Sequence, residues 1–279
     1  MASTLAGRIG LIGDPVAHSL SPVFQQAAFD ALGIGLRYEL LPTPAEEIQA
    51  RLAELRSGEF VGVNVTVPHK EVFYATVDQR SEVAERVGAV NTITCLDGRL
   101  VGDNTDVHGF VQSLKDADFQ FSGRQAVVLG AGGASRAVVV GLLDSGIEQV
   151  VLANRTLERA QVIIDDLGDE RIVPVTLVEV PEHAKGASLL VNATSLGWNH
   201  ETLPVSRQTF TNLLPGAIAY DLTYRSTAFL ETAQEHEIRT VDGLAMLVHQ
   251  GARSFEIWTG QTAPFDAMWT AATAARDAG

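Results

Sequence analysis

The chain has 279 residues, of which 46% are hydrophobic, so it can bury one large core or two smaller ones. Its formal net charge of −14 at pH 7 opposes binding to nucleic acid, because a phosphate backbone would be repelled. No apolar run approaches the roughly 20 residues of a membrane-spanning helix, and the first residues lack a signal-peptide pattern. The single cysteine, Cys95, excludes an internal disulfide and a cysteine-based metal site. We expect a cytoplasmic protein without a metal or a membrane partner.

Short apolar runs, which are typical of buried strands, alternate with amphipathic helical patterns along the chain. The expected strands cover residues 8–12, 36–41, 60–67, 125–129, 149–153, 189–191 and 217–219. The expected helices include residues 45–55, 134–143, 157–167, 244–258 and 264–276. This alternation predicts an α/β protein whose parallel sheets are covered on both faces.

A second strand-helix series opens at Gly130, which predicts a domain boundary around residues 104–106. We expect one domain to comprise residues 1–104 and 242–279, and the other to comprise residues 105–241. No strand pattern separates the last two helices. We therefore expect them to return and pack on the first domain.

The Gly-rich turn follows a predicted strand and precedes a predicted helix. Its members Gly130, Gly132, Gly133 and Ala134 would let backbone N–H groups approach a pyrophosphate. A Gly-rich turn can also serve packing alone, and Ser135 stands where a third glycine or alanine is usual. The position between strand and helix favours a dinucleotide site.

The residues after the next strand indicate which dinucleotide would bind. An NAD site places an acidic residue about 20 residues beyond the turn, whereas this chain has Asn154, Arg155 and Thr156 there. Arg155 and Arg159 lie four positions apart on one helical face, where both guanidiniums can meet a 2′-phosphate. We predict NADP. The alternative is that the two arginines only decorate a solvated helix.

Lys70 is the candidate acid-base residue. In residues 61–67 valines alternate with Asn64 and Thr66, so polar groups share one face of a strand. Pro68 predicts a helix start, which places Lys70 in the first helical turn, where the macrodipole disfavours a cation. A lysine at such a position suits acid-base catalysis, although most lysines are solvated surface residues.

Several further polar residues admit both a functional and a structural interpretation. Asp106 precedes the helical pattern 107–114, where it can partner Lys70 or merely complement the helix N-terminus. Ser21 can be an N-cap before Pro22, Asn91 a turn residue, and Gln250 an exposed helical residue. Taken singly, none of them identifies a site.

Taken together, the motifs resemble the shikimate dehydrogenase family along nearly the full chain. They lie at residues 13–22, 64–70, 88–92, 104–106, 130–135, 154–156, 192–195 and 242–247. The resemblance implies an N-terminal substrate domain, a Rossmann domain and C-terminal helices that rejoin the first domain. It also implies reversible reduction of 3-dehydroshikimate to shikimate by NADPH in aromatic amino acid biosynthesis, and it allows a homodimer.

The resemblance also implies roles for individual residues. Lys70 and Asp106 would form the catalytic pair. The other implied substrate ligands are Ser19, Ser21 and Tyr224 at the carboxylate, and Thr66, Asn91 and Gln250 beside Lys70 and Asp106 at the ring hydroxyls. The implied cofactor ligands are Gly130, Gly132, Gly133 and Ala134 at the pyrophosphate, Asn154, Arg155, Thr156 and Arg159 at the adenosine phosphate, and Leu222 and Gly243 beside the nicotinamide.

Two other functions stay open at this point. A quinate or dual quinate/shikimate dehydrogenase shares the fold, but serine at both Ser19 and Ser21 and the Arg155 clamp favour shikimate and NADP. A non-catalytic sensor would be expected to lose the Lys70 and Asp106 pair or to add a DNA-binding module. The departures from the family pattern are Trp198, where methionine is usual, and Ala228, where proline is common.

Overall fold

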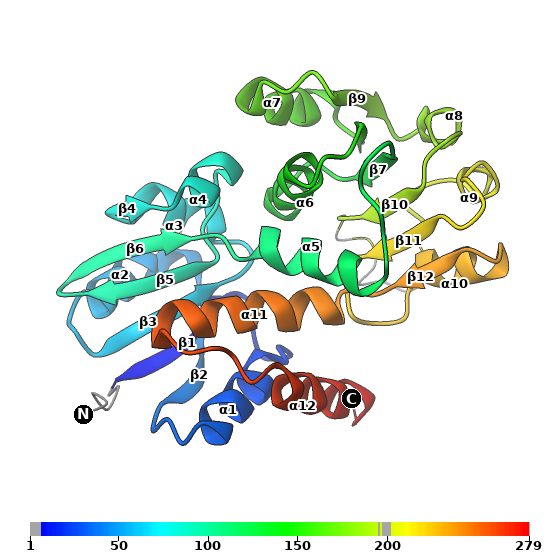
Figure 1. Ribbon diagram of the computed structural model, residues 1–279. Coiled ribbons are helices and arrows are strands. Elements are labelled where there is room, and N and C mark those ends of the chain that lie inside the picture. Colours follow the sequence, from blue (N-terminus) through cyan, green and yellow to red (C-terminus); the bar gives the residue numbers. More distant parts are fainter. Residues whose placement is uncertain (1–6, 195, 197–201, 279) are drawn as a thin grey trace. The chain divides into compact units, whose positions relative to one another are not determined.

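The structure is a computed structural model that describes residues 7–194, 196 and 202–278. It divides into two compact units (Figure 1). The first unit runs to Gly109 and resumes at Leu247, and the second comprises Phe110–Met246. Within the described residues, each unit is built on its own six-stranded sheet. The α/β fold class predicted from the sequence is confirmed.

The first sheet has the strand order β2-β1-β3-β5-β6-β4. Its strands are β1 (Arg8–Gly13), β2 (Arg37–Pro42), β3 (Phe60–Val65), β4 (Gln79–Arg80), β5 (Thr92–Leu96) and β6 (Arg99–Asp103). The expectation of parallel sheets holds only in part here, because β5 runs antiparallel to both β3 and β6. Asp97 and Gly98 join β5 to β6 with φ angles of 49° and 78°, which suit a two-residue hairpin turn.

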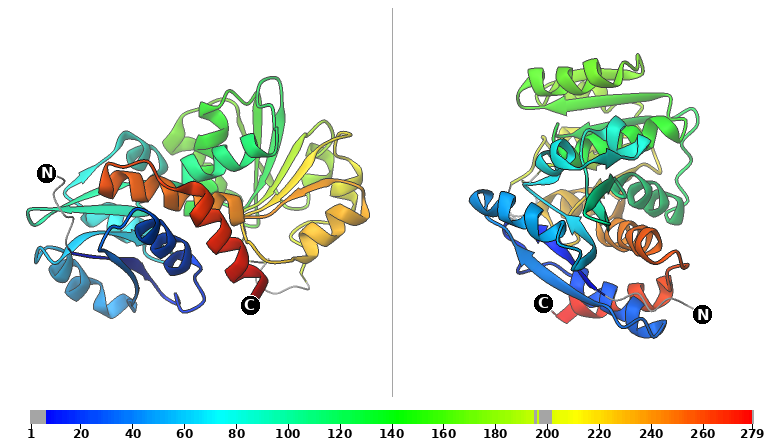
Figure 2. Two further views of the ribbon diagram at one scale, coloured as in Figure 1. Left: turned by 60° about the horizontal axis from the view of Figure 1, so that its bottom comes forward. Right: turned by 90° about the vertical axis from the view of Figure 1, so that its left-hand side faces the viewer.

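The helices that lie wholly or partly in this unit are α1 (Ser21–Ala31), α2 (Ile48–Leu55, preceded by the 3₁₀ turn Ala45–Glu47), α3 (Lys70–Thr76), α4 (Glu82–Val87), α5 (Asp106–Asp116), α11 (Leu244–Thr259) and α12 (Phe265–Ala278). Helices α5 and α11 each run across a unit boundary. The C-terminal return is confirmed, because α12 packs against α1 (Figures 1 and 2). In the described part of the chain, no helix is both long and apolar enough to cross a membrane.

Two hydrogen bonds fix α11 within the first unit. The indole N–H of Trp258 donates to the carbonyl of Ile93 at 3.0 Å. Gln25 of α1 donates to the carbonyl of Gly251 at 2.9 Å. Gly62 is required beside Trp258, because a Cβ there would lie 2.3 Å from the indole nitrogen. These contacts hold α11 against the sheet at Trp258 and against α1 at Gly251.

Apolar side chains of β1, β3 and β5 form the core beneath this sheet, with Phe73 of α3 packed among them. Cys95 packs partly buried against that core. Burial raises the pKa of its thiol to about 12, so the thiol stays protonated at neutral pH. Cys95 thus acts as a small apolar side chain at the edge of this core.

The second sheet is entirely parallel and has the order β12-β11-β10-β7-β8-β9. Its strands are β7 (Gln125–Leu129), β8 (Gln149–Asn154), β9 (Ile172–Thr176), β10 (Leu189–Asn192), β11 (Ile218–Asp221) and β12 (Arg239–Val241). Counted from β7 as strand one, this is the Rossmann order 3-2-1-4-5-6. The order reverses between β7 and β10, the point at which such sheets bind dinucleotides.

Helices cover the second sheet on both faces, as α6 (Gly133–Asp144), α7 (Leu157–Leu167), α8 (Val180–His183), α9 (Gln208–Thr211) and α10 (Ala228–Glu235). Ala126 and Val128 of β7 enter one apolar core, and Val127 and Leu129 enter the other. Burial on both faces explains the continuous apolar run that predicted this strand.

Candidate active site

The turn after β3 places Lys70. Thr66 N–H donates to the carbonyl of Ile12 at 2.8 Å, and His69 N–H donates to the carbonyl of Thr66 at 3.0 Å. The buried His69 ring also pairs with the carbonyl of Thr43 at 2.6 Å. Because residues 66–69 form this turn, α3 begins at Lys70 rather than at Pro68. Lys70 is therefore the first residue of its helix.

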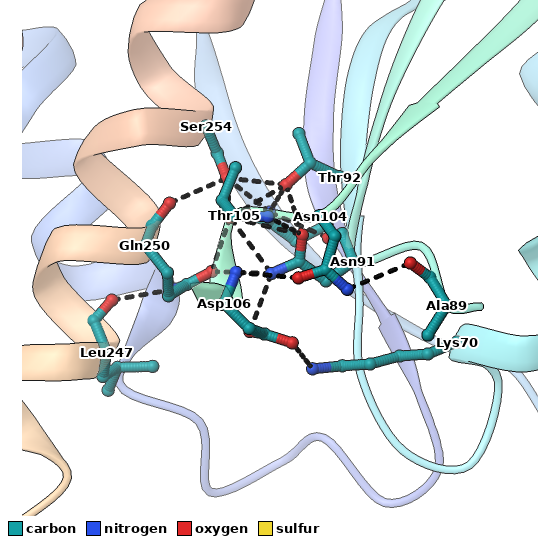
Figure 3. A network of polar contacts seen from close by, with 11 residues as sticks. Lys70, Ala89, Asn91, Thr92, Asn104, Thr105, Asp106, Leu247, Gln250 and Ser254 are labelled. Carbon is teal, nitrogen blue, oxygen red and sulfur yellow. Dashed lines mark hydrogen bonds and ion pairs between the residues drawn. The ribbon is translucent and has the colours of Figure 1, made fainter. Parts of the chain in front are cut away.

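Lys70 and Asp106 form an ion pair with a distance of 2.6 Å from Nζ to Oδ2. Asp106 is the first residue of α5, and its own N–H donates to Asn104 Oδ1 at 3.1 Å. Asn104 thus caps the start of the helix, while the Asp106 carboxylate points to Lys70 (Figure 3). A capping role alone does not explain Asp106.

Asn91 holds the other oxygen of the same carboxylate. Its amide donates to Asp106 Oδ1 at 2.8 Å, and its Oδ1 accepts the backbone N–H of Thr105 at 2.8 Å. The same amide lies 3.4 Å from Oε1 of the half-buried Gln250, whose Nε2 donates to the carbonyl of Leu247 at 2.8 Å. The structure thus brings Lys70, Asp106, Asn91 and Gln250 together (Figure 3). We refer to these four residues as the acid-base cluster.

A buried hydrogen-bond network supports the acid-base cluster from behind. Asn64 donates to the carbonyl of Asn91 at 3.1 Å and to Ser254 Oγ at 2.9 Å. Thr92 Oγ1 lies 2.8 Å from Ser254 Oγ, and Tyr38 donates its hydroxyl to Asn64 Oδ1 at 2.8 Å. Tyr38, Thr92 and Ser254 were not predicted to belong to the site. Their partners lie as far as 190 positions away, so no local pattern marks them.

The segment that contains Ser19 and Ser21 contradicts the expectation that Ser21 is an N-cap. Ser21 is the first residue of α1 and is buried, whereas Leu20 occupies the N-cap position without a side-chain bond. Ser21 is therefore not the N-cap. Instead, Ser19 Oγ accepts the N–H of Ser21 at 3.2 Å, because the chain turns tightly into the helix there.

Tyr38 joins this segment to the supporting network. Burial raises the pKa of the Tyr38 hydroxyl, and a side-chain hydrogen bond with Ser21 opposes that rise. Tyr38 also bonds Asn64, as described above, so Ser21 is connected to Asn91 through buried polar groups. Thr66 lies against Gly13, where a Cβ would come within 2.4 Å of the threonine methyl group.

In the second unit, the Gly-rich turn follows β7 directly. Gly130 has a φ of 105°, and its N–H donates to the carbonyl of Ala153 at 2.7 Å. Gly132 is the N-cap of α6, and Gly133 and Ala134 are the first helical residues. Ser135 Oγ accepts the N–H of Gly132 at 3.4 Å, so this serine closes the turn. The free N–H groups at a helix N-terminus suit an anion.

The residues that follow β8 begin the next helix. Asn154 donates to the carbonyl of Thr156 at 2.7 Å, and Thr156 is the N-cap of α7. Arg155 and Arg159 are both exposed, and neither guanidinium forms an ion pair with any residue that the structure describes. Two cationic groups thus remain available at the carboxyl edge of the sheet.

The residues that follow β11 and β12 are held to neighbouring strand ends and loops by backbone contacts. Leu222 N–H donates to the carbonyl of Asn192 at 3.1 Å, and Gly243 N–H donates to the carbonyl of Thr223 at 3.0 Å. A Cβ on Gly243 would lie 2.1 Å from the carbonyl oxygen of Leu222, so only glycine fits. The half-buried Tyr224 lies in the segment that follows β11. Trp198 lies outside the described residues.

Comparison with protein families gives matches over most of the chain. Residues 11–93 match the shikimate dehydrogenase substrate binding domain, and residues 113–213 match shikimate / quinate 5-dehydrogenase. Residues 243–273 match the shikimate 5′-dehydrogenase C-terminal domain. The three matches follow one another along the chain without overlap.

Individual relatives agree. A protein of Symbiobacterium thermophilum named shikimate dehydrogenase (NADP(+)) is 42% identical, with 96% of this chain and 95% of that protein covered. A protein of Gluconobacter oxydans with the same name is 44% identical, with coverage of 90% and 89%. The structure is similar to that of shikimate 5-dehydrogenase from Thermus thermophilus in complex with NADP(H) and shikimate. That comparison gives a TM-score of 0.87 and 41% identity, and covers 96% and 99% of the two chains. This chain therefore belongs to the shikimate dehydrogenase family of oxidoreductases.

Proposed function

We propose that the protein is an NADP-dependent shikimate dehydrogenase that reversibly reduces 3-dehydroshikimate to shikimate in aromatic amino acid biosynthesis. The observation that carries this proposal is the ion pair between Lys70 and Asp106, whose carboxylate is held by Asn91. The names of the relatives support the same activity. The proposal includes a cytosolic location, in keeping with the single cysteine.

The second unit fits NADP. Gly130, Gly132, Gly133 and Ala134 offer a tight turn and a helix N-terminus for the pyrophosphate. Asn154, Thr156 and the exposed Arg155 and Arg159 lie after β8, where the adenosine 2′-phosphate is expected. Leu222 and Gly243 belong to the opposite half of the sheet, which suits the nicotinamide. When bound, NADPH supplies the hydride.

Lys70 then acts as the proton donor. Its ammonium gives a proton to the carbonyl oxygen of 3-dehydroshikimate as negative charge develops there, and it takes the proton back in the oxidation. Asp106 supplies the countercharge and orients the ammonium at 2.6 Å. The lysine must release and regain its proton at a fixed position, and the network behind Asn91 keeps the pair in place.

The other two residues of the acid-base cluster, together with Thr66, are assigned to the substrate ring. Asn91 and Gln250 present amides beside Asp106, and Thr66 lies just before Lys70, so we assign these three to the ring hydroxyls. Ser19, Ser21 and Tyr224 are assigned to the carboxylate. Hydroxyl groups suit a carboxylate because each can donate one hydrogen bond to it.

Quinate is the second candidate substrate, because the match over residues 113–213 is to a shikimate / quinate family. Quinate carries an additional hydroxyl on the carbon that bears the carboxylate, next to the groups assigned to Ser19 and Ser21. Both serines are present, and Ser21 is buried against Tyr38, which favours the smaller ligand.

One set of assays tests the proposal. Initial rates of the purified protein are measured with shikimate and with quinate, each with NADP and with NAD. We expect the highest kcat/KM for shikimate with NADP. A higher kcat/KM for quinate, or no oxidation of either substrate, would contradict the proposal.

A further inference from the structure

Two adjacent strands of the second sheet each end in a buried polar residue. Asn192 is the last residue of β10 and Asp221 the last of β11, and they are register partners. Asn192 is 0% exposed and Asp221 is 1% exposed. The amide of Asn192 donates to Asp221 Oδ2 at 2.9 Å. The two strand ends are thus joined by side chains as well as by backbone.

Each side chain also organises the loop that follows it. Asn192 Oδ1 accepts from the N–H of Thr194 at 3.2 Å and from its hydroxyl at 2.7 Å. Asp221 Oδ1 accepts the N–H of Thr223 at 3.0 Å, and Oδ2 accepts the Thr227 hydroxyl at 3.0 Å. The pair therefore fixes Thr194, directly after β10, together with Thr223 and Thr227 after β11.

The carboxylate of Asp221 is costly to bury. Among the described residues, no lysine, arginine or histidine forms an ion pair with it, and burial raises its pKa. Hydrogen bonds from Thr223, Asn192 and Thr227 oppose that rise. A carboxylate accepts all three donors at once, whereas an amide would offer one acceptor oxygen. The need for three acceptor positions accounts for an aspartate here.

These two loops lie at the dinucleotide edge of the sheet. The sheet order reverses between β7 and β10, so the loop after β10 borders the Gly-rich turn. A Cβ on Gly130 would lie 3.0 Å from the carbonyl oxygen of Ala193. On the other side, Gly243 packs on the carbonyl of Leu222. Ala193 and Leu222, the first residues after β10 and β11, therefore each pack against a glycine that leaves no room for a side chain.

We propose that Asn192 and Asp221 are paired positioning residues that hold Thr194 after β10 and residues 222–227 after β11 for the nicotinamide half of the cofactor. The proposal rests on the function proposed above. The Gly-rich turn and β8 serve the adenosine half of a Rossmann sheet, which leaves β10 and β11 for the other half. Neither residue needs to touch the cofactor, because the Asn192 side chain acts through Thr194 and the Asp221 carboxylate acts through Thr223 and Thr227.

A reciprocal exchange tests the pair. Asp221→Asn leaves one acceptor oxygen for three donors, and Asn192→Asp places two carboxylates within hydrogen-bond distance. The double variant N192D/D221N restores a donor and an acceptor between the two positions, with the direction of the bond reversed. In this double variant the carboxylate at position 192 would still accept from Thr194, and the amide oxygen at position 221 would still accept from Thr223.

We expect each single variant to lower kcat by about 10-fold to 100-fold, because displaced loops misplace the reacting groups. The fluorescence of bound NADPH should change, since it reports the surroundings of the nicotinamide. The affinity for adenosine 2′,5′-bisphosphate should stay unchanged, because that probe occupies only the adenosine half. The double variant should be better than either single variant in kcat and fluorescence but below the parent, because the Thr227 hydroxyl still lacks its acceptor at position 221.

Ser226→Ala is the matched control, because Ser226 lies in the same loop but its hydroxyl pairs with exposed Glu231. If a single variant does not fold, Thr227→Val tests the pair by removing one donor to Asp221 without a change in charge. The same change removes the N-cap bond from Leu230 N–H to the Thr227 hydroxyl, and the loss of melting temperature shows what that bond contributes. Melting temperature is measured for every variant.

Folded single variants, or a folded Thr227→Val, with parent kcat and parent fluorescence would overturn the proposal. A folded double variant no better than the worse single would also overturn it. Failure of the proposed function would instead appear in the unmodified protein, as an absence of NADP-linked shikimate oxidation.

Discussion

Lys70 Nζ lies 2.6 Å from Asp106 Oδ2, and the two side chains are only 18% and 8% exposed. The two residues come from the first positions of different helices, α3 and α5. Since Asn91 occupies the second carboxylate oxygen, the pair has one preferred geometry. This arrangement suits a proton donor, because it holds the Lys70 ammonium at the same position in every turnover.

Lys70→Met keeps a side chain of similar length and removes the ammonium. We expect kcat to fall by roughly 10²-fold to 10⁴-fold, the usual contribution of positioned acid-base catalysis. NADP binding, measured by fluorescence titration, should remain close to that of the parent, and melting temperature shows whether the fold persists. A kcat within a few-fold of the parent would refute the role of Lys70.

Asp106→Asn should also lower kcat, because it removes the countercharge that orients Lys70. The double variant K70M/D106N should be little worse than the worse single one, because residues that act as a unit are not additive. Steady-state kinetics of the four proteins provides the comparison. Independent losses that multiply would mean that the two residues do not work as a pair.

Ser19→Ala and Ser21→Ala should each raise the KM for shikimate and leave the KM for NADP unchanged. Ser19→Ala should also destabilise the protein by about 1 kcal/mol, since its hydroxyl accepts the N–H of Ser21 at the start of α1. Ser57→Ala is the control, because the Ser57 hydroxyl makes the same kind of bond to Glu59 N–H. Unchanged KM values for shikimate in both variants would leave the serines a structural role only.

Arg155→Ala should raise the KM for NADP and change the KM for NAD little, since a charge-assisted bond to phosphate contributes about 1.5–3 kcal/mol. The matched control is Arg124→Ala. Arg124 is also exposed but immediately precedes β7, at the opposite edge of the sheet. Equal efficiency of the unmodified protein with NADP and NAD would argue against the phosphate clamp.

Asp78 gives the first unit a pH-dependent contribution to stability. Its pKa lies below the ordinary value of 3.8, chiefly because Arg56 donates to it, and secondly because the N–H of Leu100 does. The contribution is present above the unfolded-state pKa and is lost as pH falls through the lower folded-state pKa. Asp78→Asn should cost up to about 1 kcal/mol near neutral pH, a small amount because the pair is partly exposed. The difference in melting temperature should shrink with acidification, and a constant difference would contradict this account.

Much of the fold could be predicted because its signals are local. The strand at Gln125–Leu129, the turn at Gly130 and the helix at Leu157–Leu167 all follow from short patterns. The hairpin of β5 and β6 was missed although Asp97 and Gly98 are a strong turn signal. The missed edge strand β9 contains Pro174, which weakens a strand pattern.

The residues of the acid-base cluster were predicted from family motifs, whereas the hydrogen-bond network behind them was not. Asn64 and Ser254 form a hydrogen bond although 190 positions separate them, and Tyr38 reaches the network from β2. No periodicity connects such residues. The position of Ser21 inside α1 rather than at its cap was also beyond the sequence, because Ser19 and Ser21 both suit a cap.

The most direct test of the account is the reduction of 3-dehydroshikimate itself. Purified protein is incubated with 3-dehydroshikimate and NADPH, NADPH loss is followed by absorbance, and the product is identified by chromatography. We expect one shikimate to form for each NADPH consumed, and a much lower rate with Lys70→Met. NADPH consumption without shikimate, or an equal rate with Lys70→Met, would contradict it.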